Sequence, residues 1–395
     1  MLPDQTTVTD LSELAERASG VVAELRNRML LPDASKIAPT ISSEKLAVIT
    51  GLTKAQIQYR IEKGMPAGIS AVRGGRREFT LTEAQEWARS ERKDKLRPAG
   101  CKAVTIGVAF FKGGVTKTTT AMTLAQGLSL LGHRVLNIDL DPQGSLSTLH
   151  GLLPDSEITE EETLGPLFHG SASDVRYAIR KTYWPGIDLI PAASALFGAE
   201  FSLPSRQVRD RDFQFWDVLN QALDSVRDEY DVIIIDTPPS LSYMTINAFF
   251  AADGMIVPMT TNMLDMASSA QFWNLFSELA EGIGKNQAKP KTYEFVNILL
   301  SKVNNSESTT KAVREWIQTV YGGRVLPVEI PMTTVASSQV NQFATAFDVT
   351  KYEGDARTYK RAREAYENMA LAIEESIGLA WERQLKALNP VVTQN

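Results

Sequence analysis

The chain has 395 residues, a net charge of −6, one cysteine and three histidines. A chain of this length usually forms two or three domains. The single cysteine, Cys101, excludes an internal disulfide and a cysteine-only metal site, and three scattered histidines disfavour a histidine metal site. No run of about 18 apolar residues predicts a membrane span, and the polar, acidic N-terminus is not typical of a signal peptide. We therefore expect a cytoplasmic protein.

The positive charge is concentrated in the N-terminal part of the chain. Between Thr53 and Arg97 there are eleven Lys or Arg residues against six Asp or Glu residues, although the net charge of the whole chain is −6. A basic segment in an acidic chain is typical of a module that contacts the phosphates of DNA.

The first predicted element is an amphipathic helix from Val8 to Leu31. Its apolar residues recur at steps of three and four and form one stripe: Leu11, Leu14, Ala18, Val21, Leu25 and Met29. A lone helix cannot bury such a stripe, so it either docks on its own domain or pairs with a second copy of the chain. We favour pairing, because the loop from Pro32 to Pro39 separates the helix from the next predicted domain. Residues 1–38 are therefore assigned to a dimerisation helix.

Residues 39–98 are predicted to form a winged helix-turn-helix domain. A short helix from Ser42 to Ile49, a turn at Gly51 and a second helix from Thr53 to Ile61 follow the helix-turn-helix pattern. The glycine turn within residues 73–81 resembles the wing of such domains, a closing helix over 82–88 follows, and the charged residues 90–100 predict a linker. We expect contacts to DNA from Lys54, Gln56, Gln58, Arg60, Arg73, Arg76 and Arg77. The alternative is a helical domain with a structural role.

A glycine-rich stretch dominates the remaining chain. An apolar strand over 104–111 runs into Lys112-Gly113-Gly114-Val115-Thr116-Lys117-Thr118-Thr119, and a good helix former follows. Glycines permit a tight turn whose N–H groups reach phosphate oxygens, and the next helix N-terminus adds more N–H groups. The layout predicts a phosphate-binding P-loop in which Lys117 reaches the β- and γ-phosphates and the Thr118 hydroxyl binds Mg²⁺.

This stretch resembles the deviant Walker A motif of the ParA/MinD family of ATPases. Phe111 and Thr116 replace two glycines of the common P-loop, and Lys112 matches the family's signature lysine. The resemblance implies ATP and Mg²⁺ as cofactors, with ADP as the product. It also implies that Lys112 reaches the nucleotide of a second protomer. A side chain at Thr116 is expected to crowd the loop and slow turnover. The nucleotide-binding residues are then Lys112, Gly113, Gly114, Val115, Thr116, Lys117, Thr118 and Thr119.

Apolar strands alternate with helical segments throughout residues 99–395, the predicted ATPase domain. The expected strands cover 104–111, 135–140, 187–191, 232–236, 254–259, 295–302 and 325–330. Such alternation predicts an α/β fold, a P-loop NTPase with a mostly parallel sheet between helices on both faces. Its nucleotide is expected at the carboxyl ends of the strands.

Aspartates follow two of these strands. Asp139 and Asp141 follow the strand over 135–140, and Asp236 ends the strand over 232–236. The segment with Asp139 and Asp141 resembles the family's switch I. The segment with Asp236 resembles its Walker B strand, followed by switch II. The resemblance places Asp139 and Asp236 with Thr118 at the metal and lets Asp141 position the attacking water. The catalytic residues would be Lys112, Lys117 and Asp141. For Asp139 and Asp141 the alternative is ordinary solvation of a strand end.

Two segments near the C-terminus add further expectations. The ends of the segments 295–304 and 327–331 occupy the positions of the loops that wrap the adenine in the family, without assignment of individual side chains. The predicted helix over 355–388 begins with a basic cluster, which the family uses to contact DNA of any sequence. Lys360 and Arg363 are the favoured contacts, and a solvated helix face is the alternative.

Over its whole length the chain resembles the larger ParA-type partition ATPases. The resemblance implies a weak ATPase that closes into a homodimer on ATP, binds non-specific DNA and is stimulated by a ParB-like centromere-binding protein. It also implies repression of its own operon through an operator site, and a cytoplasmic, nucleoid-associated location. The main alternative is a nucleotide-sensing repressor without significant turnover.

Other members of the superfamily fit less well. The nitrogenase iron protein needs cluster cysteines that one cysteine cannot supply, and a cobyrinate-type synthetase needs an amidotransferase motif that the sequence lacks. A MinD-like membrane role needs a C-terminal amphipathic anchor, but residues 385–390 are too few and too polar.

Overall fold

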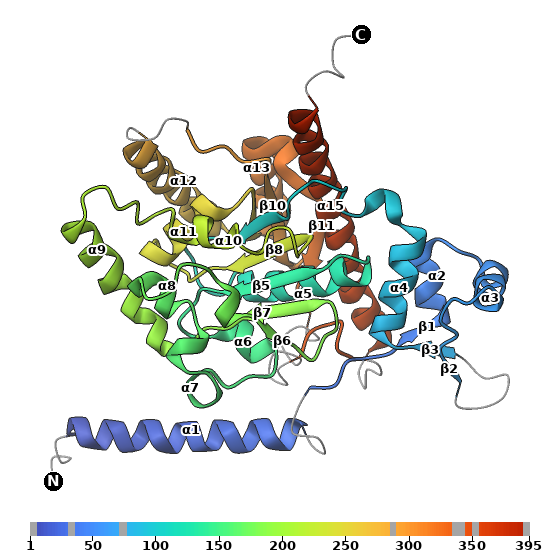
Figure 1. Cartoon of the computed structure of the whole chain (residues 1–395), viewed down its shortest axis with the longest axis horizontal. Helices are drawn as coiled ribbons and strands as arrows, with labels where there is room; N and C mark the ends of the chain where they lie inside the picture. The colour runs from blue at the N-terminus through green and yellow to red at the C-terminus, as the bar shows by residue number, and fades with distance from the viewer. Residues whose placement is uncertain are drawn as a thin grey trace. The chain divides into compact units, whose positions relative to one another are not determined.

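The computed structural model describes residues 6–30, 36–70, 77–284, 290–333, 344–349 and 355–389. The chain divides into two units, residues 1–37 and residues 38–395. The smaller unit holds α1 (Val8–Leu30), which covers the predicted amphipathic helix (Figure 1). Its first turn is closed by Asp10, which accepts hydrogen bonds from the backbone and hydroxyl of Thr7 at 2.7 Å. Leu11, Leu14 and Val21 are each more than half exposed within this unit.

The larger unit begins with a module of three helices and three short strands. It runs through β1 (Ile41–Ser42), α2 (Ser43–Thr50), α3 (Lys54–Glu62), β2 (Ile69–Ser70), β3 (Arg77–Phe79) and α4 (Leu81–Glu91). The strands form an antiparallel sheet in the order β1-β3-β2. Gly51, at a φ of 72°, ends α2 in the left-handed conformation, and Thr53 and Gln56 form a capping box that begins α3. The expected pair of short helices around a glycine turn is therefore present.

The segment predicted to be a linker is instead anchored to the rest of the unit. It contains a short 3-10 helix, η1 (Lys93–Lys95). The Arg97 side chain donates to Asp231 Oδ1 at 3.0 Å, and Arg92 donates to the Leu131 carbonyl at 2.9 Å. Alternating charges suggested a solvated connector, but these arginines find buried acceptors on segments more than 30 residues away.

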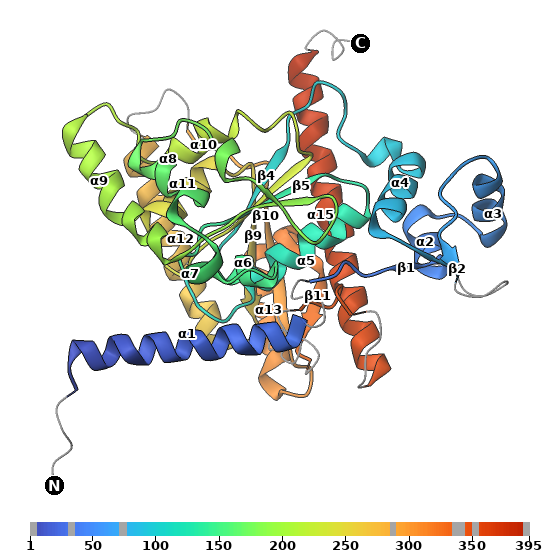
Figure 2. The ribbon, with the colours of Figure 1, turned by 60° about the horizontal axis from the view of Figure 1, so that its bottom comes forward.

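The central sheet has eight strands in the order β11-β10-β9-β4-β8-β5-β7-β6 (Figure 2). All seven predicted strands are present and parallel, and the short β6 adds an antiparallel edge that was not predicted. The strands are β4 (Val104–Val108), β5 (Val135–Asp139), β6 (Arg180–Lys181), β7 (Ile187–Ile190), β8 (Val232–Asp236), β9 (Gly254–Thr260), β10 (Phe295–Val303) and β11 (Val325–Pro331). Near-continuous apolar runs suit strands covered on both faces.

Helices cover both faces of this sheet. On one face, α5 (Lys117–Leu130) and α15 (Ala356–Leu388) pack against side chains of β4 and β8 such as Ile106 and Ile234. On the other face, α10 (Val218–Leu223) and α11 (Tyr243–Ala251) cover β5 and β8, and α12 (Met263–Gly284) and α13 (Ser308–Tyr321) cover β9 and β10. The predicted three-layer α/β fold is therefore confirmed.

Shorter elements complete the described chain. The helices are α6 (Ser145–Leu149), α7 (Pro154–Glu157), α8 (Gly165–His169) and α9 (Ala199–Arg209), with 3-10 turns η2 (Glu160–Glu162), η3 (Arg176–Ala178), η4 (Ser194–Gly198) and η5 (Gly322–Arg324). Within the described residues, no helix is both long and apolar enough to cross a membrane.

Candidate functional site

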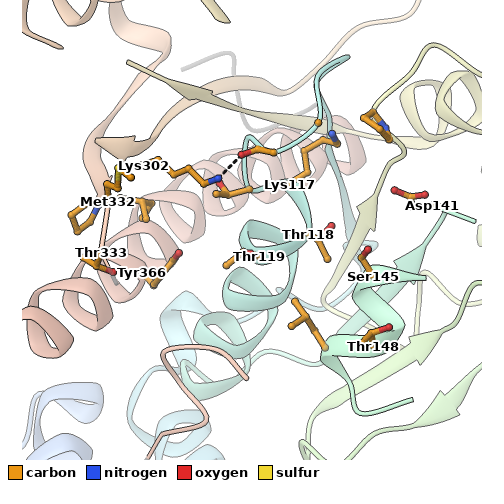
Figure 3. Close-up of a pocket in the computed structure, with 17 residues that line it drawn as sticks. Lys117, Thr118, Thr119, Asp141, Ser145, Thr148, Lys302, Met332, Thr333 and Tyr366 are labelled. Carbon is orange, nitrogen blue, oxygen red and sulfur yellow. Dashed lines mark hydrogen bonds between the residues drawn. The ribbon is translucent and has the colours of Figure 1, made fainter. Parts of the chain in front are cut away.

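A cavity of about 710 Å³ opens at the carboxyl ends of the parallel strands. The loop before α5 forms one wall, the α6 segment a second, and the ends of β10 and β11 with α15 a third (Figure 3). Its lining residues include Gly113, Gly114, Thr116, Lys117, Thr118, Thr119, Asp141, Ser145, Thr148, Lys302, Met332, Thr333 and Tyr366. The predicted P-loop and switch I thus share one cavity.

The loop between β4 and α5 has the backbone of an anion-binding turn. Gly114 and Thr116 both have left-handed φ angles, of 78° and 76°. Such turns direct successive N–H groups into one concavity, and α5 adds the free N–H groups of its first turn. A non-glycine residue in this conformation costs about 1–2 kcal/mol, so Thr116 carries strain that the glycine of the common motif avoids.

Lys117 supplies the central positive charge. Its side chain is buried in the cavity wall, and its Nζ donates to the Lys112 carbonyl at 2.9 Å. Burial lowers the pKa of Lys117, while Asp236 and Asp141 act in the opposite direction. A buried ammonium beside these N–H groups is suited to bind a polyphosphate.

Sheet register brings two of the predicted carboxylates together. Asp139 ends β5 and Asp236 ends β8, and the two residues are direct partners across these strands. Burial raises the pKa of Asp139 to about 7, although hydrogen bonds from the Ser147 backbone and hydroxyl at 2.8 Å lower it. Asp139 therefore holds the beginning of α6, a role that the sequence did not predict.

Asp236 has fewer hydrogen-bond partners than Asp139. It is fully buried, and burial followed by the nearby Asp139 raises its pKa well above the ordinary value. Thr118 and Lys117 act to lower that pKa, yet neither carboxylate oxygen has a partner of standard hydrogen-bond geometry in the described part of the chain. A buried carboxylate without such a partner needs a cation or a donor from outside the chain.

The residues present fit a magnesium ion that is bound with a nucleotide. No group of three or more His, Cys, Asp or Glu side chains that could hold a metal occurs among the described residues. Mg²⁺ commonly takes only one or two protein oxygens and completes its shell with phosphates and water. Asp236 and the Thr118 hydroxyl offer such oxygens beside the P-loop.

Asp141 lies at the mouth of the cavity. Its Oδ1 accepts a hydrogen bond from the Gln143 N–H at 3.0 Å, and its own N–H donates to Asp139 Oδ1 at 3.1 Å. The side chain is partly exposed and lines the cavity, where it can accept a hydrogen bond from water. This position suits a residue that orients a nucleophile, the role that the family resemblance implies for Asp141.

The predicted signature lysine is held by a residue that sequence reasoning missed. Lys112 Nζ forms an ion pair with Asp265, in the first turn of α12. Asp265 is 1% exposed and also accepts hydrogen bonds from the Thr260 backbone and hydroxyl at 3.2 and 2.5 Å. Nothing in the local pattern around Asp265 distinguishes it from an ordinary acidic residue at a helix start.

For the third wall of the cavity, the family resemblance implied only which segments lie there and not which side chains. This wall is lined by residues 330–333 at the end of β11, by Lys302 of β10 and by Tyr366 of α15. Figure 3 shows Lys302 and Tyr366 lying across from the α5 N-terminus. Burial raises the pKa of Tyr366, so its hydroxyl stays protonated. Lys302 lies at the end of β10, in a segment expected near adenine, whereas Tyr366 comes from the helix over 355–388, for which only contacts to DNA were predicted.

None of the predicted DNA contacts that the structure describes lines this cavity, and these residues differ in their exposure and hydrogen bonding. Lys54 and Gln58 are exposed on α3, whereas Gln56 belongs to the capping box and Arg60 pairs with Glu91 at 3.0 Å. Arg77 lies in β3; Arg73 and Arg76 fall outside the described residues.

The two residues of α15 that are favoured for contact with DNA, Lys360 and Arg363, differ in exposure and in their partners. Lys360 is exposed and lies 3.7 Å from Glu364. Arg363 instead packs over the Phe347 ring and donates to Tyr359 Oη at 3.0 Å and Glu367 Oε1 at 3.1 Å. Exposed Arg357 and Arg361 flank Lys360 on the same helix.

Comparison with solved structures agrees with the fold. A protein described as a partition protein aligns with a TM-score of 0.63 at 18% identity, over 93% of this chain and 97% of that one. The cobyrinic acid a,c-diamide synthase of Mycobacterium smegmatis, solved with an ATP analogue and magnesium, aligns with a TM-score of 0.53 at 27% identity, over 69% and 94%. The cobyrinate-type alternative thus shares the fold.

Sequence relatives decide the family. A model of an AAA domain matches residues 103–289. A candidate replication protein A of Rhizobium rhizogenes is 31% identical over 392 residues, covering 95% of this chain and 97% of that protein. The chromosome partitioning protein ParA of Caulobacter vibrioides is 32% identical over 228 residues, covering 57% of this chain and 79% of that protein. The chain therefore belongs to the ParA/MinD family of partition ATPases.

Proposed function

We propose that this protein is the ATPase of a DNA partition system and that it hydrolyses ATP with Mg²⁺ in the cavity before α5. The observation that carries the proposal is the position of Asp236, a buried carboxylate without a standard hydrogen-bond partner, beside Lys117 and Thr118. The solved Mycobacterium smegmatis synthase with an ATP analogue and magnesium supports the same ligands for this cavity.

The chain's own residues act mainly by position and charge. The N–H groups of residues 114–117 and the Lys117 ammonium hold the β- and γ-phosphates. Asp236 and Thr118 hold the magnesium ion, which when bound neutralises charge on the phosphate oxygens. Asp141, whose N–H donates to Asp139, orients the attacking water. Strain at Thr116 is consistent with weak intrinsic turnover.

ATP is proposed to close two protomers into a dimer, with Lys112 of each reaching the nucleotide of the other. The ion pair between Lys112 and Asp265 supports this by placing Lys112 beside the cavity rather than inside it. Exposed Leu11, Leu14 and Val21 of α1 support a second, nucleotide-independent contact between copies. Both contacts join identical surfaces, as expected for a symmetric dimer.

Two surfaces are proposed to bind DNA. The exposed side chains of α3, Lys54 and Gln58 among them, together with Arg77 of β3, would read an operator and repress the protein's own operon. The exposed cluster of Arg357, Lys360 and Arg361 at the start of α15 would bind chromosomal DNA of any sequence. The ATP-bound dimer would therefore be nucleoid-associated, and a ParB-like protein at a centromere site would stimulate hydrolysis and release it from DNA.

The first experiment measures ATP hydrolysis and binding to a non-specific DNA duplex, with ATP and with ADP. Wild type is expected to bind the duplex only with ATP, and Lys117→Ala to lose both activities. Lys311→Ala, which removes an exposed lysine from α13, serves as the matched control and should behave as wild type. DNA binding that is unaffected by Lys117→Ala would refute the proposal.

A second candidate is a repressor that senses nucleotide without significant turnover. The observation that favours it is the direct packing of α4 on α5, where Arg89 donates to the Gly132 carbonyl at 2.8 Å beyond the end of α5. Because α5 begins at the P-loop, this contact links the cavity to the N-terminal module. Binding to a single operator-like sequence, indifference of non-specific DNA binding to ATP, and no hydrolysis would favour this function.

A further inference from the structure

Two side chains at the end of β10 hold two consecutive carbonyl groups of the P-loop. The buried Ser301 hydroxyl donates to the Val115 carbonyl at 3.0 Å, and Lys302 Nζ donates to the Gly114 carbonyl at 2.7 Å. Figure 3 shows the Lys302 side chain reaching across the cavity to the loop. These residues are separated by more than 180 positions in the chain, so this contact exists only in the folded protein.

The geometry of the peptide bond gives these contacts a consequence. In a planar trans peptide the C=O of one residue and the N–H of the next point in opposite directions. The Gly114 carbonyl shares its peptide plane with the Val115 N–H, and the Val115 carbonyl shares its plane with the Thr116 N–H. Holding the two carbonyls against Lys302 Nζ and the Ser301 hydroxyl therefore turns the Val115 and Thr116 N–H groups away from those two atoms. In a P-loop these N–H groups bind phosphate oxygens.

Backbone strain coincides with the same contact. Thr116 and Lys302 are the non-glycine residues with left-handed φ in the described chain, at 76° and 50°. Strained residues persist where their surroundings determine the conformation. The Thr116 hydroxyl is buried and has no hydrogen-bond partner among the described residues, so its own side chain does not hold the turn. The hydrogen bonds from Ser301 and Lys302 are then the contacts that stabilise this turn.

We propose that Ser301 and Lys302 are positioning residues for nucleotide binding. They hold the P-loop in the turn that directs the Val115 and Thr116 N–H groups toward phosphate. They thereby compensate for a threonine where the common motif has glycine. The inference rests on the proposed nucleotide binding and adds to it two residues that act through the P-loop backbone.

Calorimetric titration of the full-length chain with ADP and Mg²⁺ tests the proposal. Ser301→Ala is expected to weaken ADP binding about fivefold, as for the loss of one buried hydrogen bond, and Lys302→Met by a similar factor. Ser301→Thr keeps the hydroxyl and should stay within about twofold of wild type. Ser225→Ala is the control, because that hydroxyl donates to the Ala222 carbonyl at 2.8 Å and does not line the cavity.

A glycine at position 116 distinguishes a positioning role of Ser301 from a general loss of stability. Glycine adopts the left-handed turn without strain, so adding Ser301→Ala to Thr116→Gly should weaken ADP binding less than about twofold. A general loss of stability, measured by urea unfolding without nucleotide, would affect both backgrounds and would not imitate this rescue. The proposal is overturned if Ser301→Ala binds ADP like Ser225→Ala, or if its loss is equal in both backgrounds. Failure of wild type to bind ADP would instead overturn the proposed function, and this inference with it.

Discussion

The Arg92 guanidinium binds both carboxylate oxygens of Glu374, through hydrogen bonds of 2.8 and 2.6 Å. Arg92 directly follows α4 of the N-terminal module, and Glu374 lies in α15 of the ATPase domain. His133 Nε2 lies 2.8 Å from the same carboxylate. The side chains of the ion pair are 13% and 6% exposed, so a buried charge network joins the two parts of the chain.

We predict that Glu374→Gln lowers the free energy of unfolding by about 3 kcal/mol, because it leaves the Arg92 charge buried without its counter-ion. Urea unfolding at pH 7 measures the change. Glu375→Gln, at the exposed neighbouring position, should change stability by less than about 0.5 kcal/mol. Equal effects of the two substitutions would contradict a buried network at this junction.

The lowered pKa of Glu374 predicts that the free energy of unfolding depends on pH. Burial acts to raise the pKa of Glu374, but hydrogen bonds from His133 and Arg92 outweigh it and hold the pKa below its ordinary value of 4.5. A lowered pKa in the folded state gives stability that is present above the unfolded value and lost as pH falls through the folded value. The stability difference between wild type and Glu374→Gln should therefore shrink as pH falls below about 4.5. A difference that is constant from pH 7 to pH 3 would contradict this assignment.

Asp236→Asn is expected to raise the free energy of unfolding and to weaken the binding of ADP with Mg²⁺. Removing a buried charge without a standard hydrogen-bond partner should stabilise the nucleotide-free protein by about 1–2 kcal/mol. The same change should weaken binding of ADP with Mg²⁺ at least tenfold and leave the metal-free affinity almost unchanged, because the metal loses a carboxylate ligand. Thermal unfolding and calorimetry measure the two effects. Unchanged magnesium dependence would argue against Asp236 as a metal ligand.

Lys112→Ala is expected to destabilise the protein by about 2 kcal/mol, because Asp265 stays buried without its cation. Adding Asp265→Asn should recover most of that stability. Neither variant should form the proposed ATP-dependent dimer, which sedimentation measures, and both should bind ADP within about twofold of wild type. Dimer formation by Lys112→Ala would refute a role for this lysine across the interface.

The two basic positions on α15 should separate DNA binding from packing. Lys360→Ala and Arg361→Ala should each weaken non-specific DNA binding and reduce its logarithmic salt slope by about 1. Arg363→Ala should instead lower stability by about 1–2 kcal/mol, because its guanidinium packs on Phe347 and holds Glu367. Fluorescence anisotropy across salt concentrations, with urea unfolding as the second readout, distinguishes the two outcomes.

Short-range patterns in the sequence were sufficient to predict the α/β fold and to place the glycine-rich loop between a strand and a helix. Strand periodicity predicted all seven parallel strands, and glycine spacing with Lys112 and Lys117 located the P-loop. The aspartates at strand ends were also correctly placed, because parallel strands bring their carboxyl ends to one edge. These features depend on the conformation of a few consecutive residues, which local side chains determine.

Contacts between distant segments were decided only by the tertiary structure. Ser301 meets Val115 across 186 positions, and Arg92 meets Glu374 across 282. Arg363 illustrates the limit most clearly: its basic neighbours suggested a surface for DNA, but the fold places Phe347 and Glu367 around it. A sequence specifies which side chains can pair, but packing decides which partners come within reach, because burial and hydrogen bonding act through space rather than along the chain.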